Sequence, residues 1–167
     1  MSLEQVQAQL NDAGFNLTGT LSPEAFDTLV PETWRSRDCA SLLIVGNGGR
    51  ALWSEFQRAP ESLLREDPLD AYTARVLGEI ARSVDPPAAV GLYWEQRRGD
   101  YLPMMKLAER AGLGSPSRLG ILLHPDFGPW LAVRAVLYLP FAVASGNPLR
   151  FDPCSGCPAP CAADGDC

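Results

Sequence analysis

The chain has 167 residues, of which 46% are hydrophobic and 20% charged, a composition typical of one folded domain with a sizeable core. Its formal charge of −6 at pH 7 disfavours nucleic acid and anionic membranes as partners. No apolar run approaches the roughly 20 residues that span a bilayer, and the N-terminus lacks the features of a secretory signal. We therefore expect a cytoplasmic protein whose thiols are reduced.

The first half of the chain predicts four helices and one strand. Ser2 is the expected N-cap of the first helix, and Gln5 is placed to complete a capping box. The apolar run 41–45 predicts a strand that is buried on both faces. The helices are expected over residues 2–11, from Ser22-Pro23-Glu24, over 51–58, and from a cap at Asp67 to a break at Asp85-Pro86-Pro87.

The second half predicts one helix, three strands and a different kind of C-terminal segment. The helix is expected over 101–110, and the strands over 88–94, 119–123 and 131–139. After Pro140 the composition shifts to Gly, Pro, Ala and Cys, with little left to pack. We therefore expect an α+β domain over 1–150, with about four strands and interleaved helices, followed by a cysteine-rich module over 151–167.

The glycine run Gly46-Asn47-Gly48-Gly49 follows a predicted strand and precedes a predicted helix. Backbone N–H groups at such a position can surround a phosphate. The run lacks the third glycine of the dinucleotide fingerprint, which favours a tight strand-to-helix turn. A second interpretation is that Gly48 and Gly49 form a loop that approaches a large cofactor.

Asp100 precedes the predicted helix over 101–110 and has two interpretations. Asp is a favoured N-cap, which stabilises a helix by roughly 0.5–2 kcal/mol relative to Ala. Alternatively, Asp100 is a general acid that faces a pocket. Met104 and Met105, just downstream, are expected in the core.

The segment around the turn His124-Pro125-Asp126-Phe127-Gly128-Pro129-Trp130 holds several candidate binding residues. His124 is the only histidine, which argues against a multi-histidine metal site and favours a hydrogen-bonded structural residue, with ligand contact as the minority alternative. The turn also presents Trp130. Arg118 and Arg134 lie in apolar surroundings, where a guanidinium reaches either solvent or a cavity that holds an anion.

Four of the five cysteines, Cys154, Cys157, Cys161 and Cys167, follow a C-x2-C-x3-C-x5-C pattern. Thiolates at C-x2-C spacing bind zinc or an iron–sulfur cluster, and the neighbouring Pro and Gly allow the backbone to wrap the metal. The spacing does not decide between the two.

The run Asp100-x-x-Pro103, followed by Leu107-Ala108-Glu109-Arg110-Ala111-Gly112-Leu113-Gly114, resembles the cobalamin-dependent epoxyqueuosine reductases. The segments 67–70 and 124–134 are similar to cobalamin-processing proteins of the CblC type. Reductive dehalogenases are related to both families. The resemblance covers residues 40 to 167 and implies a nitroreductase-like α+β fold with flanking helices that holds a corrinoid.

The resemblance also implies site residues. It gives Asp100 the position of the proton donor above the cobalt, and it places Arg118 near an arginine that handles a thiol cosubstrate. The spacing before the third cysteine is one residue longer than in the reductases and the spacing before the fourth two longer. One 4Fe-4S cluster on all four cysteines is therefore compatible with the sequence, whereas a two-cluster module and transfer RNA as substrate are not expected.

The sequence leads to two hypotheses from different functional classes. In the first, the protein binds a corrinoid and acts on the upper ligand of cobalamin, with Gly48, Gly49, Arg118, His124, Trp130 and Arg134 at the cofactor and electrons from a thiol or a flavoprotein. In the second, the same fold is a non-catalytic iron–sulfur or zinc protein that transfers electrons or binds a partner. A dimeric flavin enzyme is disfavoured, because nothing in the sequence indicates the required dimer.

Overall fold

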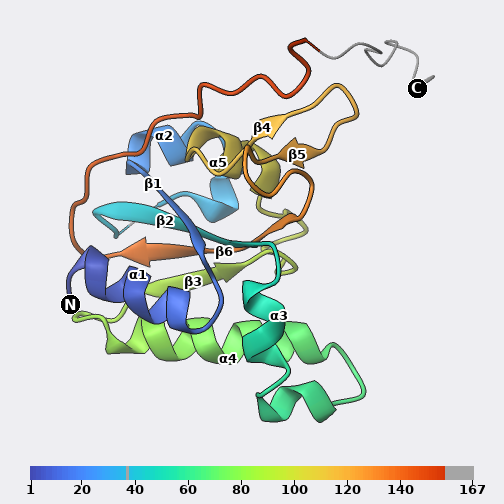
Figure 1. Ribbon diagram of the computed structural model, residues 1–167. Coiled ribbons are helices and arrows are strands. Elements are labelled where there is room, and N and C mark those ends of the chain that lie inside the picture. Colours follow the sequence, from blue (N-terminus) through green and yellow to red (C-terminus); the bar gives the residue numbers. More distant parts are fainter. Residues whose placement is uncertain (37, 157–167) are drawn as a thin grey trace.

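The computed structural model describes residues 1–36 and 38–156, and its centre is a four-stranded antiparallel sheet of order β1-β2-β6-β3 (Figure 1). A separate two-stranded ribbon, β4-β5, stands beside it. The strands are β1 (Leu17–Leu21), β2 (Ser41–Gly48), β3 (Ala89–Leu92), β4 (Ser115–Pro116), β5 (Leu122–Leu123) and β6 (Leu131–Leu139).

Helices cover both faces of the sheet (Figure 1). One face packs against α1, α3 and α4, and the other against α2 and α5, so β2 is buried along its whole length. The α-helices are α1 (Leu3–Asp12), α2 (Pro23–Asp27), α3 (Ala51–Phe56), α4 (Pro68–Ser83) and α5 (Met104–Arg110). Two 3₁₀ turns, η1 (Glu32–Trp34) and η2 (Pro60–Leu63), complete the set described for these residues. This arrangement confirms the expected α+β class.

The bounds predicted from local sequence patterns agree closely with the structure for α1 and β6. Ser2 caps α1 in the predicted box, with its side chain accepting from Gln5 N while the Gln5 side chain accepts from Ser2 N. The strand predicted over 131–139 has those bounds. Asp67 stands at the predicted N-cap position of α4, but its φ of 41° is left-handed and its side chain makes no capping hydrogen bond. Helix α4 begins with Pro68, whose missing N–H costs nothing at the first helical position.

Three other expectations need correction. The predicted strand over 41–45 continues to Gly48, so most of the glycine run lies in β2 and not in a turn. The strand β1 was missed, because its sequence Leu-Thr-Gly-Thr-Leu carries too little apolar signal. Only residues 122 and 123 of the predicted strand over 119–123 pair, with 115 and 116 across a short hairpin.

Strand β6 contains a bulge that changes which face its side chains occupy. Val45 pairs with Ala135 but Gly46 pairs with Val133, so Arg134 is the extra residue. Beyond it, Ala135 and Leu137 belong to the core on the α4 side, whereas Leu131 and Val133 pack on the α5 side. An inserted residue shifts the two-residue alternation of a strand by one step, which accounts for this exchange of faces.

After β6 the chain runs back across the molecule as an extended segment, residues 140–156, that passes the free edge of β1 and reaches the β4–β5 hairpin (Figure 1). Thr20 holds it there, donating through Oγ1 to the Ala144 carbonyl at 2.7 Å and accepting from Gly146 N at 2.9 Å. Residues 144–147 are therefore attached to the domain. Among the described helices, none is long and apolar enough to cross a membrane.

Candidate functional site

A surface between α5, the β4–β5 hairpin and the start of β6 carries an unusual concentration of exposed apolar side chains. Met105, Leu119, Ile121 and Trp130 are between 44% and 77% exposed. Two of them, Met105 and Ile121, line a hollow of about 420 Å³, whose other apolar lining includes Met104, Leu122, Leu131 and Val133. We call these residues, together with Leu119 and Trp130, the apolar shelf. An exposed apolar patch of this kind marks a binding surface more often than scattered single side chains do.

The bulge at Arg134 builds part of this shelf. It turns Leu131 and Val133 toward the α5 side, where they form the side of the hollow that β6 contributes. The sequence analysis placed Met104 and Met105 in the core, which is wrong for Met105. Its side chain is 46% exposed, because α5 is a short helix whose outer face looks over the hairpin and not into the sheet.

Gly48 and Gly49 support an aromatic turn. A methyl group at Gly48 would lie 2.3 Å from the Phe127 ring, so only glycine allows that ring to rest on the end of β2. Gly49 has φ +64° and donates its N–H to the Trp130 carbonyl at 2.8 Å. Both backbone groups of Gly48 are held by the Asn16 side amide. In this structure the glycines hold the turn against the sheet, as the close approach of Phe127 requires.

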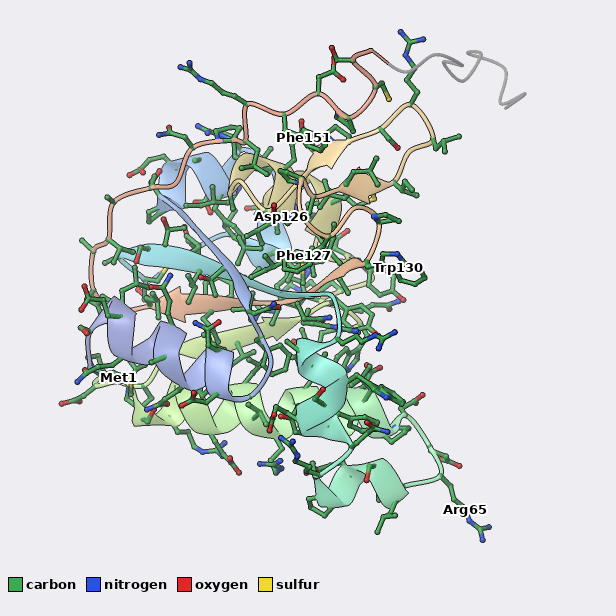
Figure 2. All side chains as sticks on the ribbon, in the orientation of Figure 1. Met1, Arg65, Asp126, Phe127, Trp130 and Phe151 are labelled. Carbon is green, nitrogen blue, oxygen red and sulfur yellow. The ribbon has the colours of Figure 1, made fainter. Side chains whose placement is uncertain are left out.

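His124 and Trp130 occupy opposite ends of that turn. The half-buried His124 ring lies 4.9 Å from Phe127, and its Nδ1 accepts the Asp126 N–H at 3.0 Å. Phe127 packs against the core on the α5 side, whereas Trp130 is 77% exposed and lies at the edge of the molecule in Figure 2. A hollow of about 570 Å³ lies beside them, lined by Gly49, Arg50, Asp126, Phe127 and Trp130. The structure thus brings Gly48, Gly49, His124 and Trp130 together around Phe127.

Arg134 enters a polar network on the other side of the sheet from the shelf. Its Nε donates to Asn47 Oδ1 at 3.0 Å, and its Cζ lies 5.9 Å from the centre of the Tyr93 ring. The Tyr93 hydroxyl donates to the Asp70 carboxylate at 3.0 Å. Burial, and next the Asp70 hydrogen bond, raise the pKa of Tyr93. This network holds the bulged arginine through one hydrogen bond and one aromatic contact.

Asp100 is not a helix cap, because α5 begins at Met104 and Pro103 stands at the cap position. Its carboxylate accepts the Thr33 hydroxyl at 2.8 Å, and its carbonyl accepts the Trp34 indole N–H at 2.9 Å. Thr33 and Trp34 belong to η1. Nothing in the local sequence indicated that this turn contacts Asp100. The hydroxyl fixes the position of the carboxylate in a half-buried setting.

Arg118 lies in the β4–β5 turn, and its backbone N–H points at the Cys154 sulfur at 3.4 Å. The extended segment thus brings the first cysteine of the C-terminal pattern to the hairpin that borders the shelf. Cys157, Cys161 and Cys167 lie outside the described residues. Within the described ranges, no group of three or more His, Cys, Asp or Glu side chains is placed to hold a metal ion.

The predicted site residues therefore fall into separate groups. Gly48, Gly49, His124 and Trp130 cluster around Phe127, Arg118 pairs with Cys154, Arg134 pairs with Asn47, and Asp100 pairs with Thr33. Sequence reasoning missed the contributions of Thr33, Met105 and Ile121. The alternation of apolar and turn residues over 119–123 is the one signal that pointed toward Ile121.

No family model and no curated protein sequence matches the chain. Solved structures do match. Epoxyqueuosine reductase from Streptococcus thermophilus superposes with a TM-score of 0.60 at 12% identity, covering 94% of this chain and 50% of that one. The B12-trafficking protein CblC from C. elegans gives 0.57 at 13% identity, covering 89% and 76%.

A reductive dehalogenase, whose structure was described for B12-dependent dehalogenation, gives a TM-score of 0.56 at 16% identity, covering 89% of this chain and 21% of that one. The chain spans about half the length of the epoxyqueuosine reductase it matches. These identities establish fold and not activity. The chain therefore has the α+β fold, an antiparallel sheet flanked by helices, that is shared by epoxyqueuosine reductase, the CblC protein and the reductive dehalogenase.

Proposed function

We propose that the protein binds a corrinoid at the apolar shelf and acts on the upper ligand of cobalamin, as a reductase or as a cobalamin-processing protein. The observation that carries the proposal is the shelf itself, where the exposed side chains of Met105 and Ile121 line a hollow of about 420 Å³ and the exposed Leu119 and Trp130 follow and precede its lining residues in the chain. The shared fold supports the ligand class, since two of the three matching structures are described by their connection with B12.

The shelf suits a broad, partly apolar ring. Met105 of α5 and Ile121 of the β4–β5 hairpin both offer apolar contacts to the hollow, and Trp130, between the lining residues Pro129 and Leu131, adds a large exposed aromatic surface. Such surfaces bury ligand area and exclude water, while a few polar groups fix the orientation. The corrinoid supplies the redox chemistry at its cobalt.

The polar residues take roles around that ring. Asp100 is the proposed proton donor, and Thr33 is its positioning residue through the 2.8 Å hydrogen bond. Gly48, Gly49 and His124 hold the Phe127 turn, so they shape the border of the shelf and do not touch metal. Arg134 is engaged by Asn47, which makes its proposed role structural.

The four C-terminal cysteines remain the proposed ligands of one 4Fe-4S cluster. Cys154 lies beside Arg118 N, at the hairpin that carries Leu119 and Ile121. A cluster bound by these cysteines would lie next to the shelf, where it could pass electrons to the bound corrinoid. A thiol or a flavoprotein would supply the electrons.

The test is an anaerobic ultraviolet–visible titration of the iron- and sulfide-reconstituted protein with cob(II)alamin and hydroxocobalamin. We expect the corrinoid bands to shift at stoichiometric protein, to the form in which the lower base has left the cobalt. An unchanged corrinoid spectrum, beside the broad absorbance of an iron–sulfur cluster, would contradict corrinoid binding and favour the non-catalytic electron-transfer protein.

Two variants locate the binding surface. Ile121→Glu and Met105→Glu place a charge on the shelf, and we expect each to weaken corrinoid binding by at least about tenfold, since an unpaired carboxylate loses hydration under an apolar ligand. Leu63→Glu is the matched control, because Leu63 is 86% exposed in η2, outside the shelf. Equal affinity in all three variants would place the corrinoid elsewhere.

A further inference from the structure

Two adjoining hollows of about 470 and 490 Å³ meet at Thr33 and Arg97 and share no lining residue with the shelf. Both volumes lie in the range of small-molecule sites. Three arginines, Arg35, Arg97 and Arg98, line the pair, and Pro86, Pro87 and Tyr138 form apolar walls of the larger hollow. We call the two hollows together the arginine groove.

Arg97 is held in place by stacking. Its Cζ lies 3.9 Å from the centre of the Trp34 ring and 5.9 Å from that of Tyr138. Trp34 is fully buried and anchored through its indole N–H, and Gly91 makes room for it, because a methyl group there would lie 2.9 Å from the ring. The guanidinium face is thus covered and its edge, which carries the N–H donors, remains for a ligand.

The arginines of the groove have no acidic partner within residues 1–36 and 38–156. The ion pairs of this part of the chain involve Arg58, Arg75 and His124 only. Most other basic side chains of these residues are also unpaired, so the feature that points to a ligand is the gathering of three arginines around one pair of hollows. Their guanidinium N–H donors are available to an anion there.

Arg98 occupies a backbone conformation that arginine rarely adopts. Arg97 and Asp100 exchange both backbone hydrogen bonds at 3.0 Å, which leaves Arg98 (φ +54°) and Gly99 (φ +90°) as a two-residue hairpin turn. Asn, Asp or Gly are preferred at the first of these positions. A strained residue of this kind is a reason to look for a role of its side chain, and Arg98 lines the groove.

The charges around the groove disfavour a highly charged ligand. Two carboxylates, Glu32 and Asp38, line the groove with the three arginines. The Asp100 carboxylate, which remains an anion while it accepts the Thr33 hydroxyl, lies next to them, so the six groups balance. A phosphate-rich ligand would need a surplus of positive charge, whereas a single carboxylate needs only the N–H donors of a guanidinium edge, and the proline and tyrosine walls match a hydrocarbon body.

We propose that the arginine groove binds an organic monocarboxylate. Its carboxylate pairs with the edge of the Arg97 guanidinium and with Arg98, and its apolar body lies against Pro86, Pro87 and Tyr138. The groove shares no lining residue with the apolar shelf, but it adjoins the proposed proton donor Asp100, which Thr33 contacts. Binding of the monocarboxylate is proposed independently of corrinoid binding, and its test needs no corrinoid.

The test is fluorine NMR of 4-fluorophenylacetate titrated with the full-length protein, beside its uncharged analogue 4-fluorophenylacetamide. We expect saturable binding of the acid and at least about tenfold weaker binding of the amide, because the amide lacks the charge that the guanidinium pairs with. Inorganic phosphate is expected to compete weakly. Equal binding of acid and amide, or no saturable binding of the acid, would overturn the proposal.

Two variants test whether the acid binds in the arginine groove. Arg97→Gln is expected to weaken binding of the acid at least about tenfold. Arg65→Gln is expected to leave binding unchanged, because Arg65 lies between η2 and α4 and does not line the groove. Arg98→Gly should weaken binding while raising the melting temperature, because glycine relieves the positive φ. Unchanged affinity in both groove variants would overturn the assignment even if either variant were less stable.

Discussion

At the scale of single residues, the contacts that define the candidate site are mostly non-local. The role of Gly48 depends on Phe127, 79 positions later, and Asp100 is positioned by Thr33, 67 positions earlier. No local pattern contains such information. The sequence identified Gly48, His124, Trp130 and Asp100 as unusual, but it could not assign their partners.

Replacing Gly48 by alanine should destabilise the fold. The added methyl group would lie 2.3 Å from the Phe127 ring, so the aromatic turn must move. We expect a loss of about 1–3 kcal/mol in the free energy of unfolding, typical of overpacking, measured by urea denaturation. Gly78→Ala in α4 is the control, since its methyl group would meet only the end of Arg82 and alanine favours the helix. Equal stability of both variants would mean that Phe127 does not rest on Gly48.

Tyr138 makes stability depend on pH in the alkaline range. Burial raises the pKa of Tyr138 to about 12 from an ordinary value near 10, and its hydroxyl donates to the Trp34 carbonyl at 3.2 Å. The folded protein therefore holds the phenol proton more tightly than the unfolded chain. The resulting stabilisation is complete below pH 10 and is lost as the pH rises toward 12.

We expect the stability advantage of the wild type over Tyr138→Phe to fall by about 2 kcal/mol between pH 9 and pH 11.5. Urea denaturation of both proteins at the two pH values measures this change, and the variant cancels the titration of the other tyrosines. A constant difference across that range would show that the Tyr138 phenol titrates normally.

At the scale of elements, the helices and strands with a clear local sequence signal were predicted correctly, and those without one were missed. The capping box at Ser2 and the continuous apolar run of β6 placed their elements correctly. Strand β1 escaped notice, because its central Gly19 and two threonines form a strand only when β2 pairs with one edge and the 140–156 segment approaches the other. Of the two interpretations of Asp100, the helix cap is wrong, because α5 begins at Met104 and Pro103 stands at its N-cap position.

The segment after β6 should contribute to stability through Thr20. Thr20→Val removes the donor to the Ala144 carbonyl and one acceptor for Gly146 N. We expect a loss of about 1–2 kcal/mol in urea denaturation, with faster hydrogen exchange at the Gly146 amide. Thr28→Val, which removes an exposed bond to the Ala25 carbonyl, should have a smaller effect and leave that amide protected. Unchanged exchange in Thr20→Val would mean that the segment is held by other contacts.

At the scale of the whole molecule, the division into a domain over 1–150 and a cysteine-rich module over 151–167 stays a prediction. A chain that ends at Arg150 keeps the Thr20 contacts, so we expect one cooperative unfolding transition and corrinoid binding at the shelf, with loss of iron after reconstitution. Calorimetry and iron analysis measure these properties. Loss of the cooperative transition would show that residues beyond 150 belong to the folding unit.

The bulge at Arg134 divides one strand between two tasks. The last five residues of β6 build the interior, and its first three form an edge of the proposed binding surface. Because the change of side occurs at one residue, substitutions at 131 and 133 can alter ligand preference without disturbing the interior beneath α4. The same geometry makes the strand intolerant of length changes, since deletion of a single residue there would exchange the outward and inward sets. Diversification of this surface is therefore expected to proceed by replacement of side chains and not by insertion or deletion.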